Sequence, residues 1–259
     1  MIRGLYTSGW SMMANSKKMD VISNNLANVS TNAYKKDTVI FESFPNLLTR
    51  RINDTRSSLN PSGEVGSMEF GSDVGEVFTY YNQGQLLKTD NYSDMAISGS
   101  DNAFFTVQFG DANGNTGEYY TRDGSFTVDS NGQLVTKEGY TVMGEDGPVT
   151  VMDGGFSVQA DGTVVQNGEA VAKLLIKEFT DASTLSKFGS NLVQNAGTAN
   201  ERAFSGEVQQ GCIEQSNVNI IREMVDMITV MRAYEANQKV LQAQDGTLDK
   251  AVNEVGVVR

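Results

Sequence analysis

The chain has 259 residues, of which 39% are hydrophobic, so it is long enough for one large or two ordinary domains with a buried core. Its formal net charge of −12 argues against nucleic acid or an anionic membrane surface as the principal partner, because phosphate binding needs clustered Lys and Arg. The chain has no histidine and one cysteine, Cys212, which argues against triad and zinc chemistry and excludes an internal disulfide.

The sequence contains no segment typical of a cleaved signal peptide or a membrane span. Residues 1–19 hold Arg3, Lys17 and Lys18 but no continuous apolar run of seven or more residues. No stretch elsewhere approaches the length needed to cross a membrane. We therefore expect a chain without membrane insertion that is cytoplasmic or leaves the cell without a cleaved signal peptide.

A first helix is expected from Ile2 to about Asn28, because this segment is rich in Met, Leu, Lys and Ala. An apolar repeat with alternating spacings of three and four runs along it, and six of its eight positions are apolar. Such a stripe needs a partner surface. The positions are Leu5, Ser8, Met12, Asn15, Met19, Ile22, Leu26 and Val29.

The segment after this helix is expected to hold a strand and then an extended arm. Val39, Phe41 and Phe44 are the candidate strand residues before Pro45. From Asn46 to Gly75 the composition shifts to Asn, Asp, Arg, Ser, Gly and Pro, which indicates an extended or irregular segment with little core of its own. We expect this arm to be ordered by its neighbours.

Residues 76 to about 210 are expected to form a β-rich body. The strand-like runs are residues 104–109, 119–121, 126–128, 133–135 and 173–176. Asn131-Gly132 and Asp161-Gly162 are typical of tight hairpin turns. An internal repeat predicts two similar hairpins packed in tandem. In it, Phe126, Val128, Gly132, Leu134 and Val135 recur as Phe156, Val158, Gly162, Val164 and Val165.

A last helix is expected after Cys212, with an N-cap at Ser216-Asn217 and an end near Asn253. Its length and its apolar repeat are typical of a bundle or a coiled coil. The polar interruptions Asn15, Gln238 and Asp245 either face solvent or fix the register. The repeat positions here are Ile220, Met224, Met227, Met231, Tyr234, Gln238, Leu241, Asp245, Leu248, Val252 and Val255.

Three possible chemical sites have only weak support. Residues 111–122 resemble the opening of a calcium-binding EF-hand loop, but Thr116 and Arg122 stand where Gly and Glu are needed, so a polar hairpin loop explains them. No pair stands out among Asp123, Asp129, Glu138, Glu145 and Asp146 as a glycosidase dyad. The helical spacing of the methionines favours core or interface packing over a soft-metal site. We expect no enzyme activity, cofactor or metal.

Both ends of the chain resemble the rod, hook and hook-associated proteins of the bacterial flagellum. The N-terminal signature is Ser23, Asn24, Asn25, Leu26, Ala27 and Asn28, continued to Lys35, and the C-terminal one includes residues 216–219, 223–228, Arg232, Ala233 and Tyr234. Residues 120–126 and 131–135 are similar to the β-domain of the rod subgroup. The family usually has Gly-Phe at Ala33-Tyr34 and a glycine just before Phe104-Phe105, so the backbone at these two places is an open question.

The resemblance implies an α+β fold in which long N- and C-terminal helices pair as a coiled coil, with a central all-β domain and an extended arm. The expected divisions are 1–30 for the N-terminal helix, 31–75 for the linker and extended arm with short strands, 76–212 for the outer β-domain and 213–259 for the C-terminal helix. The family assembles as a tube lined by the terminal helices. The expected assembly residues are Leu5, Met12, Met19, Ile22, Leu26, Val29, Ile220, Met224, Met227, Ile228, Met231, Tyr234, Leu241 and Leu248.

The function that the resemblance implies is a structural subunit of the flagellar basal-body rod, which transmits torque from the motor to the hook. The opening residues, the length and the arm around Pro61 look most like the distal rod subgroup, with the proximal rod as the alternative. The implied partners are copies of the chain itself, other rod proteins, the hook protein, the rod-surrounding rings and the type III export apparatus, which would carry the chain outside the cytoplasmic membrane. A rival from another class is a secreted adhesive or carbohydrate-binding β-domain on a coiled-coil stalk. Its expected aromatic platform is missing, because Trp10 lies in the first helix.

Overall fold

The computed structural model describes residues 2–50, 64–110, 116–152, 155–189, 191–195, 197 and 199–255. The chain divides into two compact units. The helical unit contains Met1–Asn24, Asp37–Phe78 and Ile221–Arg259. The β-body contains Asn25–Lys36 and Thr79–Ile220.

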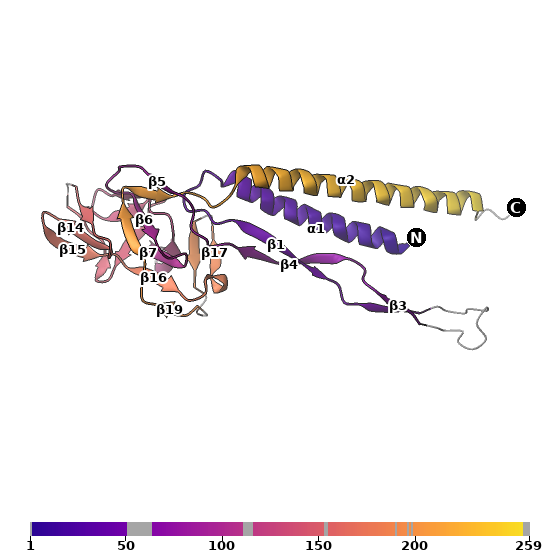
Figure 1. Cartoon of the computed structure of the whole chain (residues 1–259), viewed down its shortest axis with the longest axis horizontal. Helices are drawn as coiled ribbons and strands as arrows, with labels where there is room; N and C mark the ends of the chain where they lie inside the picture. Colours follow the sequence, from indigo (N-terminus) through magenta and orange to yellow (C-terminus); the bar gives the residue numbers. More distant parts are fainter. Residues whose placement is uncertain are drawn as a thin grey trace. The chain divides into compact units, whose positions relative to one another are not determined.

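Two long helices dominate the helical unit, as the apolar repeats predict. They are α1 (Ile2–Ala27) and α2 (Ile220–Lys250), and a π-helical turn, η2 (Ala251–Val255), extends α2. The helices lie side by side and run in opposite directions (Figure 1), and Asn237 Nδ2 of α2 donates a hydrogen bond of 2.9 Å to Ser11 Oγ of α1. None of the described helices is both long enough and apolar enough to span a membrane.

The expected N-cap of α2 is wrong. The helix begins at Ile220, three residues beyond Asn217. The side chain of Asn217 is instead held by other segments of the β-body, because it accepts a 2.8 Å hydrogen bond from Lys36 N and donates one of 2.8 Å to Tyr80 O.

The described part of the arm is built from short paired strands, so of the two expected forms, extended or irregular, it has the extended one. Strand β1 (Asp37–Ser43) pairs with β4 (Ser72–Thr79), and β2 (Leu47–Arg50) pairs antiparallel with β3 (Glu64–Met68). Between the two pairs, Phe44 N donates to Gly71 O at 3.0 Å. The expected strand is confirmed at Val39 and Phe41 as β1, but it does not include Phe44, because β1 ends at Ser43. The Ser58–Gly63 part of the arm lies outside the described residues.

The arm is attached to α1 by side-chain contacts. The rings of Trp10 and Phe44 meet edge to face with centroids 4.9 Å apart. Lys17 Nζ lies 3.1 Å from Asp73 Oδ1. Aromatic pairs of this geometry contribute about 0.5–1.5 kcal/mol beyond their buried area, whereas an exposed ion pair contributes less than about 1 kcal/mol. The aromatic contact is therefore the stronger of the two.

The β-body contains a ten-stranded sheet among the described residues, with β7 at its centre and the path β17-β18-β8-β7-β11-β10-β9. Strand β16 pairs with β7 and β19, and β12 pairs with β11. Smaller pairs and a three-stranded sheet complete the body. The strands are β5 (Leu86–Lys88), β6 (Met95–Ser98), β7 (Ala103–Gly110), β8 (Thr116–Thr121), β9 (Phe126–Val128), β10 (Leu134–Thr136), β11 (Thr141–Gly144), β12 (Gly147–Pro148), β13 (Ser157–Val158), β14 (Thr163–Gln166), β15 (Glu169–Lys173), β16 (Ile176–Phe179), β17 (Ser186–Phe188), β18 (Leu192–Gln194), β19 (Glu201–Arg202), β20 (Glu207–Gln210) and β21 (Cys212–Glu214), with the short 3₁₀ helix η1 (Ala182–Thr184).

Strand β7 is buried on both faces. Successive side chains of a strand point to opposite sides, so Phe105 and Val107 enter the larger core, while Phe104 enters a second core with Tyr120 and Phe179. Burying a Phe side chain contributes about 1.5–3 kcal/mol relative to leaving it exposed. The apolar run from 104 to 109 therefore marks the strand that holds the two halves of the β-body together.

The expected tandem hairpins are confirmed. Gly132 closes the turn between β9 and β10, and Gly162 closes the turn between β13 and β14. Each has a positive φ, 77° and 87°, and each donates to the carbonyl oxygen three residues earlier, at 2.8 and 2.9 Å. Phe126 and Phe156, the repeat's matching residues, pack into the same core.

One strand expected from the sequence is wrong. The run Lys173–Ile176 does not form a continuous strand, because β15 ends at Lys173 and β16 begins at Ile176. Leu174 lies between them and is buried in the larger core. The run is apolar because it crosses the interior between two strands.

Candidate assembly interface

Helix α2 presents two different apolar faces. Val230 is 4% exposed and, with the half-buried Met227, Tyr234 and Leu241, belongs to one face. The opposite face carries four apolar residues at the i, i+3, i+4 and i+7 spacing of one side of a helix, and their side chains are exposed in the described chain. We call these residues the apolar row: Ile221 (76% exposed), Met224 (49%), Val225 (56%) and Ile228 (51%).

The predicted assembly residues of α2 divide between these faces. Those that are exposed are Ile220, Met224, Ile228 and Met231, and those that are half-buried are Met227, Tyr234, Leu241 and Leu248. Of the polar interruptions, Gln238 and Asp245 are exposed and Asn15 is half-buried. The repeat therefore combines positions from two sides of the helix.

The predicted assembly residues of α1 and its loop are more uniformly covered. Ile22 is buried at 5% exposure. Leu5, Met12, Met19, Leu26 and Val29 are all half-buried. The stripe of α1 therefore lies closer to neighbouring side chains than the apolar row of α2 does.

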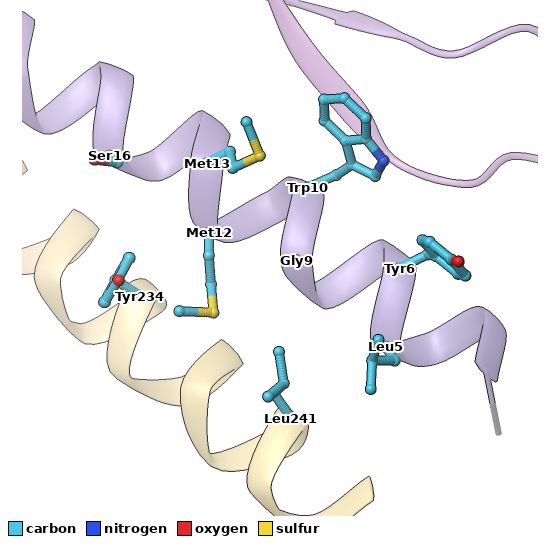
Figure 2. A pocket seen from close by; sticks show the side chains of 9 residues that line it. All are labelled: Leu5, Tyr6, Gly9, Trp10, Met12, Met13, Ser16, Tyr234 and Leu241. Atoms are coloured by element: carbon cyan, nitrogen blue, oxygen red, sulfur yellow. The ribbon is translucent and has the colours of Figure 1, made fainter. Parts of the chain in front are cut away.

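An open, apolar groove of about 570 Å³ lies along α1 and α2. It is lined by residues between Leu5 and Ser16 of α1 and by Tyr234 and Leu241 of α2. In Figure 2, Leu5 and Met12 point toward α2, while Tyr234 and Leu241 point toward α1. Gly9 faces the groove, and a Cβ added there would meet nothing within 4 Å. The groove is wide enough at Gly9 to admit side chains from another helix.

The N-terminal signature segment is fastened to the end of β21. Ala33 N donates to Glu214 O at 2.8 Å, and Tyr34 Oη donates to Asn25 Oδ1 at 3.2 Å. Ala33 has a φ of 55°, in the left-handed region that glycine occupies most easily. The usual family glycine therefore corresponds to a real bend, which this chain makes with alanine. Asn102 has no positive φ, so no such bend is needed there.

The other signature residues differ in burial. Asn25 is fully buried. Leu26, Asn28, Ala233 and Tyr234 are half-buried, and Ser23, Asn24, Ala27 and Arg232 are exposed. Tyr234 is the one that lines the groove described above.

A buried ionic cluster holds the end of the signature segment against the rest of the β-body. Glu214 accepts hydrogen bonds from Lys35 Nζ at 2.6 Å, from Arg122 Nε at 2.8 Å and from Gly84 N at 2.7 Å. Burial lowers the pKa of Lys35 to about 8, and the carboxylate of Glu214 opposes part of that shift. Three distant segments thus converge on one carboxylate. No sequence pattern predicts this cluster, because its members, residues 35, 84, 122 and 214, are 38 to 179 residues apart in the sequence.

The structure adds no support for the calcium loop or the glycosidase dyad considered in the sequence analysis. The first five residues of the calcium-like loop, 111–115, lie outside the described residues. Among the candidate acids, Asp129, Glu138, Glu145 and Asp146 are exposed, whereas Asp123 is buried and burial raises its pKa. In the described part of the chain no cluster of His, Cys, Asp and Glu could hold a metal ion. Cys212 is half-buried in β21.

Three sequence families match this chain. The family described as "Flagella basal body rod protein" matches residues 5–35. "Flagellar hook protein FlgE/F/G D1 domain" matches residues 96–166, and "Flagellar basal body rod FlgEFG protein C-terminal" matches residues 209–254. The matches therefore cover both terminal signatures and the centre of the β-body.

Curated relatives match over almost the full length. The chain is 38% identical to the flagellar basal-body rod protein FlgG of Buchnera aphidicola subsp. Schizaphis graminum, over 96% of this chain and 98% of that protein. It is 32% identical to the flagellar hook-basal body complex protein FlhO of Bacillus subtilis, over 100% of both chains. It is also 32% identical to the flagellar basal-body rod protein FlgF of Caulobacter vibrioides, again over 100% of both.

Proposed function

Because this chain belongs to the family of flagellar basal-body rod proteins and is therefore a structural, non-enzymatic subunit of the rod, we propose that it builds the distal part of that rod. In this proposal, copies of the chain polymerise into a hollow helical shaft that transmits torque from the motor to the hook. Rigidity of the assembled shaft is the mechanism, since no chemistry is required.

Relatives from both rod subgroups match this chain. We equate the FlgG subgroup with distal rod subunits and the FlgF subgroup with proximal ones. Identity to relatives named FlgG is 32% to 38%, and identity to relatives named FlgF is 31% to 32%. The opening residues 1–6 and the arm resemble the distal subgroup. The proximal rod is the alternative.

The assembly mode that we propose uses both helices. Within each subunit, α1 and α2 pair as a coiled coil, and the paired helices line the inside of the shaft. The hydrogen bond between Ser11 and Asn237 and the shared groove support this pairing. The predicted assembly residues of α1 and α2 lie on this pair and its outer faces.

The observation that carries the proposal is the exposed apolar row of α2. Contiguous exposed apolar residues on a soluble chain mark an interaction surface. Four such residues on one helix would be covered when subunits assemble, and a row of this kind is an aggregation hazard in a chain that stays monomeric. We propose that the flagellar type III apparatus exports the chain unfolded and without a cleaved signal, so that assembly takes place outside the cytoplasmic membrane. The hook protein, other rod proteins and the surrounding rings are its proposed neighbours.

Electron microscopy of basal bodies from a strain lacking this gene tests the proposal. Loss of hook and filament with a shortened rod is the expected result, and complementation with the wild-type gene restores both. A long remaining stub agrees with a distal subunit, whereas a missing rod indicates a proximal one. Complete basal bodies with full motility would overturn the structural role.

A further inference from the structure

The apolar row and the groove have matching spacings along α2. In the row, Ile221 and Ile228 are seven residues apart, and in the groove Tyr234 and Leu241 are also seven residues apart. Thirteen residues separate Ile221 from Tyr234 and Ile228 from Leu241. At the rise of an α-helix, this offset corresponds to about 20 Å along the axis.

If one copy is displaced by thirteen residues along the axis of α2, its apolar row therefore lies level with the groove of another copy. On this basis we propose that the apolar row of one subunit occupies the groove of the next subunit, with the two copies parallel and displaced by about 20 Å along α2. This inference rests on the proposed function, because it names the subunit contact by which the rod would grow.

Charge complementarity selects a second copy as the occupant. Arg232 lies one helical turn beyond Ile228 and on the same side of α2, while Asp245 lies one turn beyond Leu241. Both side chains are exposed. The same thirteen-residue shift brings Arg232 of one copy level with Asp245 of the next. One displacement thus matches two apolar pairs and one pair of opposite charges.

The groove has room for this contact. Gly9 lies in the interior of α1, where a glycine costs about 1 kcal/mol relative to alanine. Nothing lies within 4 Å of the position that its Cβ would occupy. The missing side chain allows Ile228 or Met224 of the neighbour to approach the backbone of α1. A side chain at position 9 would fill the space that we assign to the neighbour.

The row and the groove lie on different sides of α2, so the contact is heterologous. A heterologous contact with a translation along the axis does not close on itself and generates a filament. Each copy offers one row and one groove, and a chain of copies therefore leaves one unfilled groove at one end and one uncovered row at the other.

Disulfide trapping in basal bodies tests this register. Cys212 is replaced by Ser, and Ile228→Cys and Leu241→Cys are combined in one chain that complements the deletion strain. The two positions are about 20 Å apart in a single helix, too far for a disulfide within one copy. We expect a ladder of dimers and higher multimers of this chain after mild oxidation.

The matched control pairs Leu241→Cys with Thr229→Cys. Thr229 is exposed and adjacent to Ile228, but its side chain points about 100° away around the helix. It should give no ladder. Equal cross-linking in both variants, or a cross-link only to a different flagellar protein, would overturn the register.

Charge reversal provides an independent measurement. Arg232→Asp and Asp245→Arg should each reduce the amount of rod-incorporated protein roughly tenfold, because each puts like charges at the contact. The double variant should recover most of the loss.

Gly9→Leu should block incorporation of the chain into the rod while leaving the β-body folded. If wild-type protein enters the rod but the double variant shows no recovery and no ladder forms, the register is wrong and the rod function stands. Absence of the wild-type protein from basal bodies would remove the proposed function itself.

Discussion

Lys35 and Glu214 form an ion pair of 2.6 Å although their side chains are only 5% and 0% exposed. Arg122 Nε adds a second cationic contact to the same carboxylate at 2.8 Å. Glu214 is thus the anion that two buried cations share. At this point the segment from Asn25 to Lys36 contacts the rest of the β-body, so we expect the cluster to be needed for the stability of the β-body.

Glu214→Ala should lower the free energy of unfolding of the β-body by about 3–5 kcal/mol, because the change leaves two buried cations without their anion. Urea unfolding followed by near-ultraviolet circular dichroism measures this loss. Lys173→Ala is the control, since the Lys173–Glu145 pair is about half exposed and should contribute less than about 1 kcal/mol. A loss below about 1 kcal/mol for Glu214→Ala would contradict the role of the cluster.

Alkaline pH should increase the stability that Lys35 contributes. Its pKa is about 8 in the folded chain, below its ordinary value of 10.5, so between these pH values the unfolded chain binds more protons. The free energy of unfolding therefore rises with pH across this window, by about 3 kcal/mol at most.

The measurement compares wild type with Lys35→Met at pH 7.5 and pH 10. The advantage of wild type over the variant should be larger at pH 10, since the other titrating groups cancel in the difference. A difference that stays constant, or that falls with pH, would show that burial does not lower the pKa of Lys35 as the geometry requires.

Local patterns in the sequence predict the elements of this fold well. Alternating spacings of three and four locate α1 and α2, and Gly132 and Gly162 locate two hairpins, because each signal lies within a few residues. The hairpin turn between β14 and β15 was not predicted; in it Asn167 and Gly168 both have positive φ. Its Asn-Gly pair is the signal that could have found it.

Contacts between distant segments could not be read from the sequence. Glu214 brings together residues 35, 84 and 122, and no spacing rule relates those positions. The repeat of α2 also has apolar residues around much of the helix, so it identifies Tyr234 and Leu241 as interior but does not separate them from the exposed Met224. Asn237 also belongs to the side of α2 that contacts α1, but its polar side chain gives no sign of this in the sequence. Its contact is a hydrogen bond to Ser11 of the other helix.

Gly124→Ala should strongly destabilise the β-body. A Cβ at this position would lie 1.6 Å from the carbonyl oxygen of Met95, which belongs to the backbone and cannot move without breaking its neighbours' hydrogen bonds. We expect a loss of more than about 3 kcal/mol or failure to fold. Gly155→Ala is the matched control, because nothing lies within 4 Å of its added Cβ, and it should change stability by less than about 0.5 kcal/mol. Thermal unfolding of both purified variants measures the difference, and equal melting temperatures would refute the close approach.

Removing residues 45–70 of the arm should make the rod less stiff without preventing its assembly. Phe44 N and Gly71 O are already hydrogen-bonded at 3.0 Å, so residues 45–70 can be replaced by an Asn-Gly turn while Phe44 keeps its contact with Trp10. The predicted assembly residues on α1 and α2 are untouched, whereas the paired strands β2 and β3, which would reach neighbouring subunits, are lost. Electron microscopy of basal bodies should show rods that are curved or variable in curvature.

As a control, Leu47→Ser with Leu48→Ser keeps the arm but removes two exposed apolar side chains. An intermediate effect would indicate that these side chains make the contact with neighbouring subunits. A straight rod of normal length in the arm-deleted strain would exclude the arm from any stiffening role.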